Sequence, residues 1–199
     1  MTEHYFGQTP SGPQNRREVT AEVWGRSYTF TTAGGVFARD GLDKATAILL
    51  RTCAPPSQAR SVLDLGCGWG AIAVPVAREV PQATVHAIDP NERARELARL
   101  NAERAGVADR VAVMAPDDVP SEATYDEIWS NPPIRIGKAA LHELLLRWLD
   151  RLAPDGVARM VVGRNLGSDS LQRWLTEQGW PTERVTSAKG FRVLATRRG

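Results

Sequence analysis

The segment SNPPIRIGK (residues 130–138) places an asparagine and two prolines directly after YDEIW, a stretch typical of a buried strand. Proline has a fixed φ and no backbone N–H, so this pair ends a sheet and holds Asn131 extended. Asn131 and Pro132 then present a side-chain oxygen and a rigid carbonyl at the mouth of the sheet. Such acceptors suit a ligand group with two protons to donate, such as an amine. The alternative is a rigid turn that has no chemical role.

A glycine-rich loop, DLGCGWG (Asp64–Gly70), lies between an expected strand and an expected helix. Glycine lets the backbone approach a ligand closely, and ligands of open α/β sheets bind at the carboxyl ends of the strands. The spacing is G-x-G-x-G, which differs from the G-x-G-x-x-G of a dinucleotide loop. Asp64 stands two positions before the first glycine, which favours a cationic ligand over a phosphate.

Two more acids follow the next strands along the chain. Asp89 in AIDPN is placed to accept hydrogen bonds from a ribose diol, and Asp117 in MAPDDVP could accept the amino protons of adenine. Each acid alone could be an ordinary loop or capping residue. Three acids and a glycine loop at successive strand ends predict a ligand site.

From residue 61 onward, expected strands alternate with expected helices, which predicts parallel pairing with right-handed crossovers. PTERVTS and FRVLATR predict a closing hairpin that leaves the last strand antiparallel. We therefore expect a single doubly wound, Rossmann-like α/β sheet over residues 21–199, with a short N-terminal β/α lead-in. Asp43 is the expected N-cap of the lead-in helix. Residues 1–20 are polar and are expected to form an arm.

Composition favours one globular domain: the chain has 199 residues, of which 42% are hydrophobic, and a net charge of +2. This charge is too small for binding nucleic acid by a dense cationic patch alone. Cys53 and Cys67 match neither a redox pair nor a zinc site, and we expect no metal. Since no stretch has the length of a signal peptide core or a membrane span, a soluble cytoplasmic protein is expected.

The motifs together resemble class I S-adenosylmethionine-dependent methyltransferases, and more closely the methyltransferase small domain family, which includes guanine-N2 methyltransferases of ribosomal RNA. The resemblance rests on HYF, FTTAGGVFARDGLDKAT, DLGCGWG, DPNERARELARLNAE, YDEIWSNPPIRIGKA and GFRVL. It implies S-adenosylmethionine as cofactor. It also implies a role for each site residue: Gly66, Gly68 and Gly70 bound the methionine end, Asp64 orients the cofactor, Asp89 binds the ribose, Asp117 binds the adenine, and Asn131, Pro132, Pro133 and Ile134 form the catalytic element.

The implied reaction is methylation of an exocyclic nucleobase amine, first of all guanine N2 in 16S ribosomal RNA. Such an amine is a poor nucleophile because its lone pair is delocalised into the ring. If Asn131 and Pro132 each accept one amine proton, the lone pair is enriched and aimed at the methyl group. Adenine N6 would be served equally well. Protein glutamine-N5 methylation, a small-molecule amine substrate and a non-catalytic partner subunit are the alternatives.

Ile134 replaces the aromatic residue that many relatives use to stack the target base, so we expect Phe37 to stack it instead. The chain has only three lysines: Lys44, Lys138 and Lys189. Together with Arg135 they are expected to bind phosphate groups beside the predicted active site, since lysine acts as a compact point charge. Ribosomal RNA or the small ribosomal subunit is the expected partner, and the oligomeric state stays open.

Overall fold

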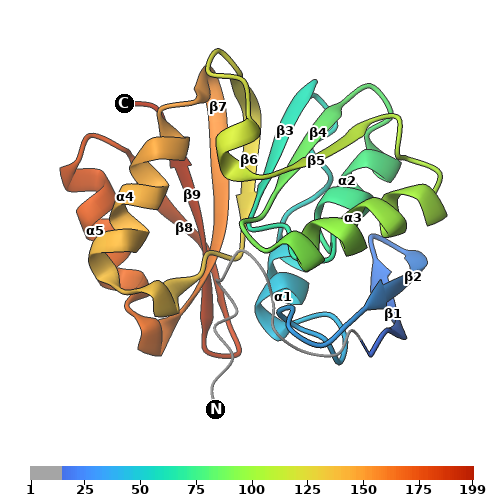
Figure 1. The fold of residues 1–199 in the computed structure, drawn as a ribbon. Helices are drawn as coiled ribbons and strands as arrows, with labels where there is room; N and C mark the ends of the chain where they lie inside the picture. The colour runs from blue at the N-terminus through green and yellow to red at the C-terminus, as the bar shows by residue number, and fades with distance from the viewer. Residues whose placement is uncertain (1–14) are drawn as a thin grey trace.

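The computed structural model describes residues 15–199 and has a seven-stranded sheet at its centre (Figure 1). The strand order is β5-β4-β3-β6-β7-β9-β8, and β9 runs antiparallel to both of its neighbours. The strands are β3 (Ser61–Leu65), β4 (Thr84–Ile88), β5 (Val111–Met114), β6 (Tyr125–Ser130), β7 (Leu152–Gly163), β8 (Thr182–Ala188) and β9 (Phe191–Arg197). The prediction of a mostly parallel, doubly wound sheet with an antiparallel last strand is confirmed.

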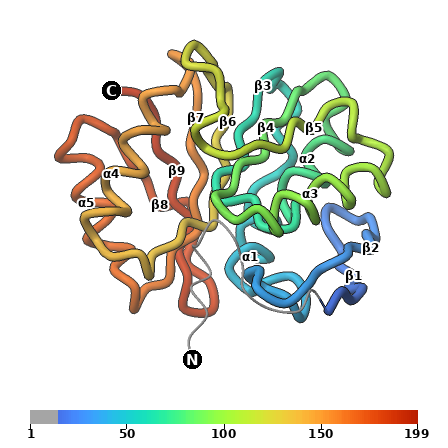
Figure 2. Tube along the Cα trace, in the orientation of Figure 1, coloured from blue at the N-terminus to red at the C-terminus, as the bar shows by residue number. Residues whose placement is uncertain are grey.

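Helices cover both faces of this sheet, as the ribbon and the tube show (Figures 1 and 2). The helices are α1 (Lys44–Thr52), α2 (Ala73–Glu79), α3 (Glu92–Arg104), α4 (Lys138–Leu149) and α5 (Ser168–Glu177). Alternate strand residues point to opposite faces, so Val62 packs with α1, α2 and α3, whereas Leu63 packs with α4 and α5. No helix within residues 15–199 is long and apolar enough to cross a membrane.

A separate antiparallel hairpin, β1 (Arg17–Val23) and β2 (Arg26–Thr32), precedes the sheet. Its two-residue turn has positive φ at Trp24 (47°) and Gly25 (77°), as a type I′ hairpin turn requires. The expected arm over residues 1–20 is therefore wrong at its end. Residues 17–20 belong to β1 because the alternation that buries Ala21 and Val23 extends back through them. Residues 1–14 of that arm lie outside the described part of the chain.

Asn101 of α3 joins the hairpin to the sheet. Its side chain accepts a hydrogen bond from Thr31 N (2.7 Å) and donates to Thr31 O (3.0 Å) and Trp69 O (2.8 Å). The residue is only 1% exposed, so these bonds are shielded from water. Asn101 thus fixes β2 relative to the glycine loop, which contains Trp69.

Candidate functional site

The glycine loop and the Asn-Pro-Pro turn begin side by side at one edge of the sheet. β3 and β6 are parallel neighbours, with Leu65 opposite Ser130, the last residue of each strand. The buried Ser130 hydroxyl donates to Leu65 O (2.7 Å) and ties the two strand ends together. Gly66 and Asn131 therefore leave the sheet at adjacent points.

Backbone bonds shape the glycine loop. Gly66 N and Cys67 N both donate to Ile88 O at the end of β4 (2.9 Å each), and Gly68 N donates to Asp89 Oδ2 (2.9 Å). Gly66 (φ 79°) and Gly68 (φ 54°) have left-handed conformations, and a Cβ at either would enter open space. The loop backbone is thus exposed to any ligand at this edge.

Asp64 lies beneath this loop at the end of β3 and is completely buried. Its Oδ2 accepts a hydrogen bond from Ala73 N at the start of α2 (2.9 Å), while its Oδ1 has no partner within residues 15–199. Burial raises the pKa of the Asp64 carboxyl to about 7, and the nearby Asp89 charge adds to the effect. An orphaned buried acceptor of this kind is one that a cationic ligand donor would satisfy.

Asp89 follows β4 and accepts hydrogen bonds from Gly68 N and from Asn91 N (2.8 Å). Burial raises the pKa of Asp89, although these two bonds act in the opposite direction. Each carboxylate oxygen keeps a free lone pair, so the group can still accept a hydrogen bond from each of two hydroxyl groups.

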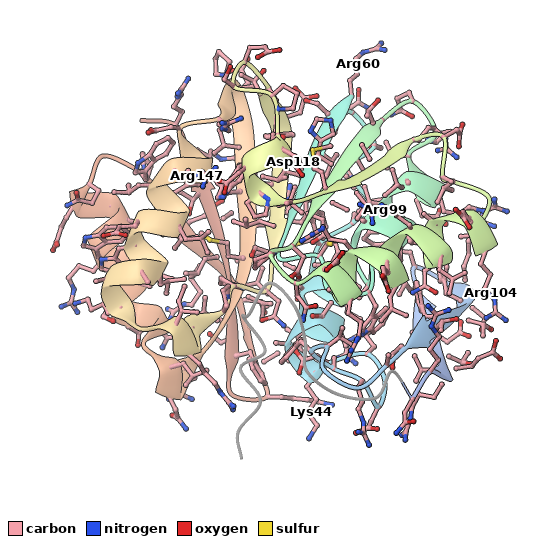
Figure 3. All side chains as sticks on the ribbon, viewed as in Figure 1. Lys44, Arg60, Arg99, Arg104, Asp118 and Arg147 are labelled. Atoms are coloured by element: carbon pink, nitrogen blue, oxygen red, sulfur yellow. The ribbon has the colours of Figure 1, made fainter. Side chains whose placement is uncertain are left out.

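Asp117 lies on the 3₁₀ segment η1 (Pro116–Asp118) after β5, with a strongly exposed side chain. It forms an ion pair with Arg147 of α4 (2.9 Å), and Arg147 also donates to Pro116 O (3.2 Å). Figure 3 shows Arg147 beside the segment that carries Asp118. The structure therefore places Asp117 after its strand as expected, but on the surface and with a competing partner.

The Asn-Pro-Pro turn is held by bonds from the residues that follow it. Pro132 O accepts from Ile134 N (2.8 Å) across Pro133, whose φ of −75° and ψ of 71° define an inverse γ-turn. Pro133 O accepts from Ile136 N (3.0 Å). The Pro132 carbonyl thus has one lone pair left, and its orientation is fixed. Ile134 begins η2 (Ile134–Ile136) and packs partly against the α4 side of the core.

A loop between β2 and α1 carries Phe37, whose side chain is 55% exposed. Three side chains hold this loop by its carbonyls: Arg93 binds Gly34 O (2.7 Å), Asn91 binds Gly35 O (2.8 Å) and Trp69 binds Ala38 O (3.3 Å). The sequence pattern did not predict these contacts. The features of the sequence that could have indicated them are Trp69, a tryptophan inside the glycine loop, and Asn91, the N-cap of α3.

The family model described as "Methyltransferase small domain" matches residues 27–195, which extend from β2 into β9. The chain belongs to the methyltransferase small domain family. This methyltransferase is 31% identical to the uncharacterized protein YbxB of Bacillus subtilis over the full length of both chains.

Two relatives with informative names match this methyltransferase over part of their length. Escherichia coli (strain K12) ribosomal RNA small subunit methyltransferase C is 35% identical over 139 residues, or 67% of this chain and 38% of that protein. A solved T. thermophilus 16S rRNA N2 methyltransferase (RsmC), in complex with AdoMet and guanosine, superimposes with a TM-score of 0.81. It is 26% identical, and the match covers 94% of this chain and 52% of that one. The chain thus spans about half or less of these two proteins.

The predicted cations of this methyltransferase are exposed near the strand-end edge. Arg135 on η2 and Lys138, the first residue of α4, follow Asn131 directly. Lys189 is in the β8–β9 turn, where Gly190 O accepts from Arg164 N at the end of β7 (2.8 Å). Lys44 begins α1 and extends from the lower end of the molecule in Figure 3. The four side chains are spread along the edge, and Arg135 and Lys138 are closest in sequence to the turn.

The residues present fit S-adenosylmethionine. Asp64 offers an unpaired buried acceptor to a cationic group, Asp89 has free lone pairs for a diol, and the glycine loop leaves open space beside its backbone. Within residues 15–199, no group of three or more histidine, cysteine, aspartate or glutamate side chains is arranged to hold a metal ion.

Proposed function

We propose that this methyltransferase transfers a methyl group from S-adenosylmethionine to an exocyclic amine of a nucleobase, with guanine N2 of 16S ribosomal RNA as the first candidate substrate. The observation that carries the proposal is the Asn131 side chain. Its amide nitrogen is held by α1, while its Oδ1 has no partner among the described residues, directly beside the glycine loop. The similarity to RsmC proteins supports the choice of RNA.

The proposed cofactor contacts use the strand-end acids. Asp64 Oδ1 would accept a hydrogen bond from the ammonium group, and Asp89 would accept hydrogen bonds from the ribose hydroxyls. Asp117 is proposed to contact the adenine, which requires that Arg147 share or release its carboxylate. When bound, S-adenosylmethionine supplies a methyl group activated by the sulfonium charge.

The acceptor chemistry depends on positioning. Asn131 Oδ1 and the free lone pair of Pro132 O would each accept a hydrogen bond from one N–H of the target amine. These two hydrogen bonds orient the amine so that the nitrogen lone pair points at the methyl group, and the nitrogen would release one proton to solvent as it gains the methyl group. Because the turn is fixed by two prolines and two backbone bonds, little reorganisation is needed during the reaction.

The target base must leave its stack to reach such a turn, so an unpaired or flipped nucleotide is the expected substrate. Phe37 has a large, exposed apolar side chain on a loop whose backbone is held by hydrogen bonds, and it is proposed to stack on that base. Arg135 and Lys138 are proposed to contact the neighbouring phosphates.

The decisive experiment compares wild type with Asn131→Ala in single turnover on 16S ribosomal RNA, with mass spectrometry of the nucleosides. We expect N2-methylguanosine from wild type and a rate lower by about a hundred- to a thousandfold in the variant, as for removal of one preorganised transition-state contact. Cofactor affinity should be unchanged. A folded Asn131→Ala protein that methylates RNA within a few-fold of wild type would refute the mechanism.

The same assay separates the alternatives. N6-methyladenosine as the product would keep the mechanism and change the base. Transfer to glutamine-bearing peptides and never to RNA would show protein glutamine-N5 methylation instead, since a primary amide could use the same two acceptors. Absence of transfer to any amine, with intact cofactor binding, would indicate a partner subunit without catalysis.

A further inference from the structure

The Asn131 amide is held in place by the first turn of α1, a helix that lies far away in sequence. Asn131 Nδ2 lies 3.0 Å from Asp43 Oδ2 and 3.0 Å from Thr46 Oγ1. Both partners belong to the lead-in segment before the glycine loop. They therefore connect the proposed acceptor site to a part of the chain that carries none of the cofactor residues.

The identity of Asp43 decides which way the amide faces. Asp43 Oδ2 also accepts from Ala45 N (2.9 Å) and Thr46 N (3.3 Å) as the N-cap of α1, so the group acts here as an acceptor. An ionised carboxylate has no proton to donate, and only the amide nitrogen of Asn131 can face it. The Asn131 oxygen is consequently directed away from α1.

The holding groups are themselves rigid. Thr46 is 5% exposed, and α1 buries Ile48, Leu49 and Leu50 against the sheet. The close packing of protein interiors restricts rotation of this buried, β-branched side chain about χ1. The orientation of the Asn131 amide is thus set by the fold before any substrate binds.

We propose that Asp43 and Thr46 are positioning residues for methyl transfer: they bind the amide nitrogen of Asn131 so that its oxygen faces the target amine. The inference rests on the proposed function. The Asp43 carboxylate has a second effect, because a hydrogen bond donated to a negative charge polarises the amide and makes its oxygen a stronger acceptor.

Thr46→Val tests the hydroxyl, because valine has nearly the shape of threonine and lacks only the acceptor. We expect a single-turnover rate lower by about three- to tenfold, the range for loss of one neutral hydrogen bond. Thr46→Ser, which keeps the hydroxyl, should restore most of the rate. Asp43→Ser keeps a capping oxygen on a shorter side chain that cannot span the distance to Asn131, and we expect a loss of about ten- to a hundredfold. Cofactor affinity and melting temperature should stay close to those of wild type for Thr46→Val.

A double-mutant cycle distinguishes positioning from a general effect on the fold. If Thr46 acts only through Asn131, Thr46→Val should not slow an Asn131→Ala protein any further. A merely structural role would slow both backgrounds equally. An NMR readout adds a test that needs no activity: the side-chain NH₂ signals of Asn131, assigned by their absence in Asn131→Ala, should shift in Thr46→Val and return in Thr46→Ser.

The outcomes separate the inference from the function on which it rests. If wild type methylates no amine of RNA, the proposed function fails, and the NMR comparison alone decides whether the amide is held. If wild type is active and Thr46→Val is equally fast, or slows Asn131→Ala by the same factor, the positioning role is refuted. Unshifted Asn131 signals in Thr46→Val would refute the contact itself.

Discussion

We predict that the buried Asp64 carboxylate lowers the free energy of unfolding and strengthens cofactor binding. The variant Asp64→Asn tests both effects. The carboxyl is fully buried with one oxygen unpaired, and its pKa is raised from 3.8 to about 7. At about 1.4 kcal/mol per pKa unit, ionising this group at neutral pH costs the folded state about 4 kcal/mol. Asparagine keeps an oxygen for Ala73 N and removes the charge.

The sign of the effect follows from proton binding. Between pH 4 and pH 7 the folded protein holds the Asp64 proton and the unfolded chain does not, so the free energy of unfolding falls as pH rises through this range. Above the folded pKa the penalty is complete and constant. Asp64→Asn lacks this slope, so its advantage over wild type should grow from pH 5 to pH 8 and then level off.

Thermal melting at pH 5, 6, 7 and 8 is the assay. For a chain of this size, a penalty of 4 kcal/mol corresponds to a difference in melting temperature on the order of 10 °C at pH 8. The orphaned asparagine NH₂ group reduces the gain by a similar amount at every pH, so the change with pH is the quantity to compare. A melting-temperature difference that is equal at pH 5 and pH 8 would show that Asp64 does not titrate in this range, and would refute the reasoning.

The same variant tests the proposed cofactor contact. Calorimetry with S-adenosylhomocysteine should show affinity for wild type that weakens between pH 8 and pH 6, because the ammonium group binds the ionised carboxylate. Asp64→Asn should bind weakly at all of these pH values. Equal binding by both proteins would remove Asp64 from the site while leaving the stability argument intact.

Other site residues, exposed or partly exposed, give three further predictions. Asp89→Ala should weaken binding of S-adenosylmethionine and S-adenosylhomocysteine by at least about tenfold in calorimetry, the cost of losing hydrogen bonds to the ribose; equal affinity would remove Asp89 from the site. Lys138→Ala should reduce the salt dependence of RNA binding by about one phosphate contact, whereas Arg60→Ala, at the opposite end of β3 in Figure 3, should leave it unchanged. Phe37→Ala should raise the KM for RNA by about five- to a hundredfold, the range for loss of one stacked base, with cofactor affinity unaffected; an unchanged KM would assign the stacking to another residue.

The sheet could be predicted from sequence because its signals are local. Alternating strand and helix patterns, and glycines at a strand end, report on neighbouring residues and fix the order of elements. The capping role of Asp43 was predicted for the same reason and is confirmed. Its contact with Asn131 could not be predicted, because it joins residues 88 positions apart and depends on where α1 packs.

The errors and omissions also have physical causes. Three of the four residues 17–20 are polar and suggest an arm, yet the strand forms because pairing with β2 supplies the backbone partners that composition does not reveal. A ligand-binding role for Asp117 was predicted from its position after a strand. Its ion pair with Arg147 could not be predicted, because it depends on where α4 lies relative to η1. Both cases concern contacts between elements that are distant in sequence.

The cofactor residues and the acceptor residues come from different parts of this chain and meet only at one edge of the sheet. Asp64 lies in β3 and Asp89 follows β4, whereas the proposed acceptor residues and the groups that hold them come from the lead-in loop, from α1 and from the turn after β6. The lead-in loop is held by carbonyl contacts to Trp69 and Asn91, so its position is fixed even though Phe37 is exposed. Substitutions at residues 37–42 that preserve these anchors should therefore change which amine is methylated without changing cofactor affinity. Because the proposed contacts of the Asn-Pro-Pro turn suit guanine N2 and adenine N6 equally, we expect discrimination between the two bases to depend on this lead-in segment.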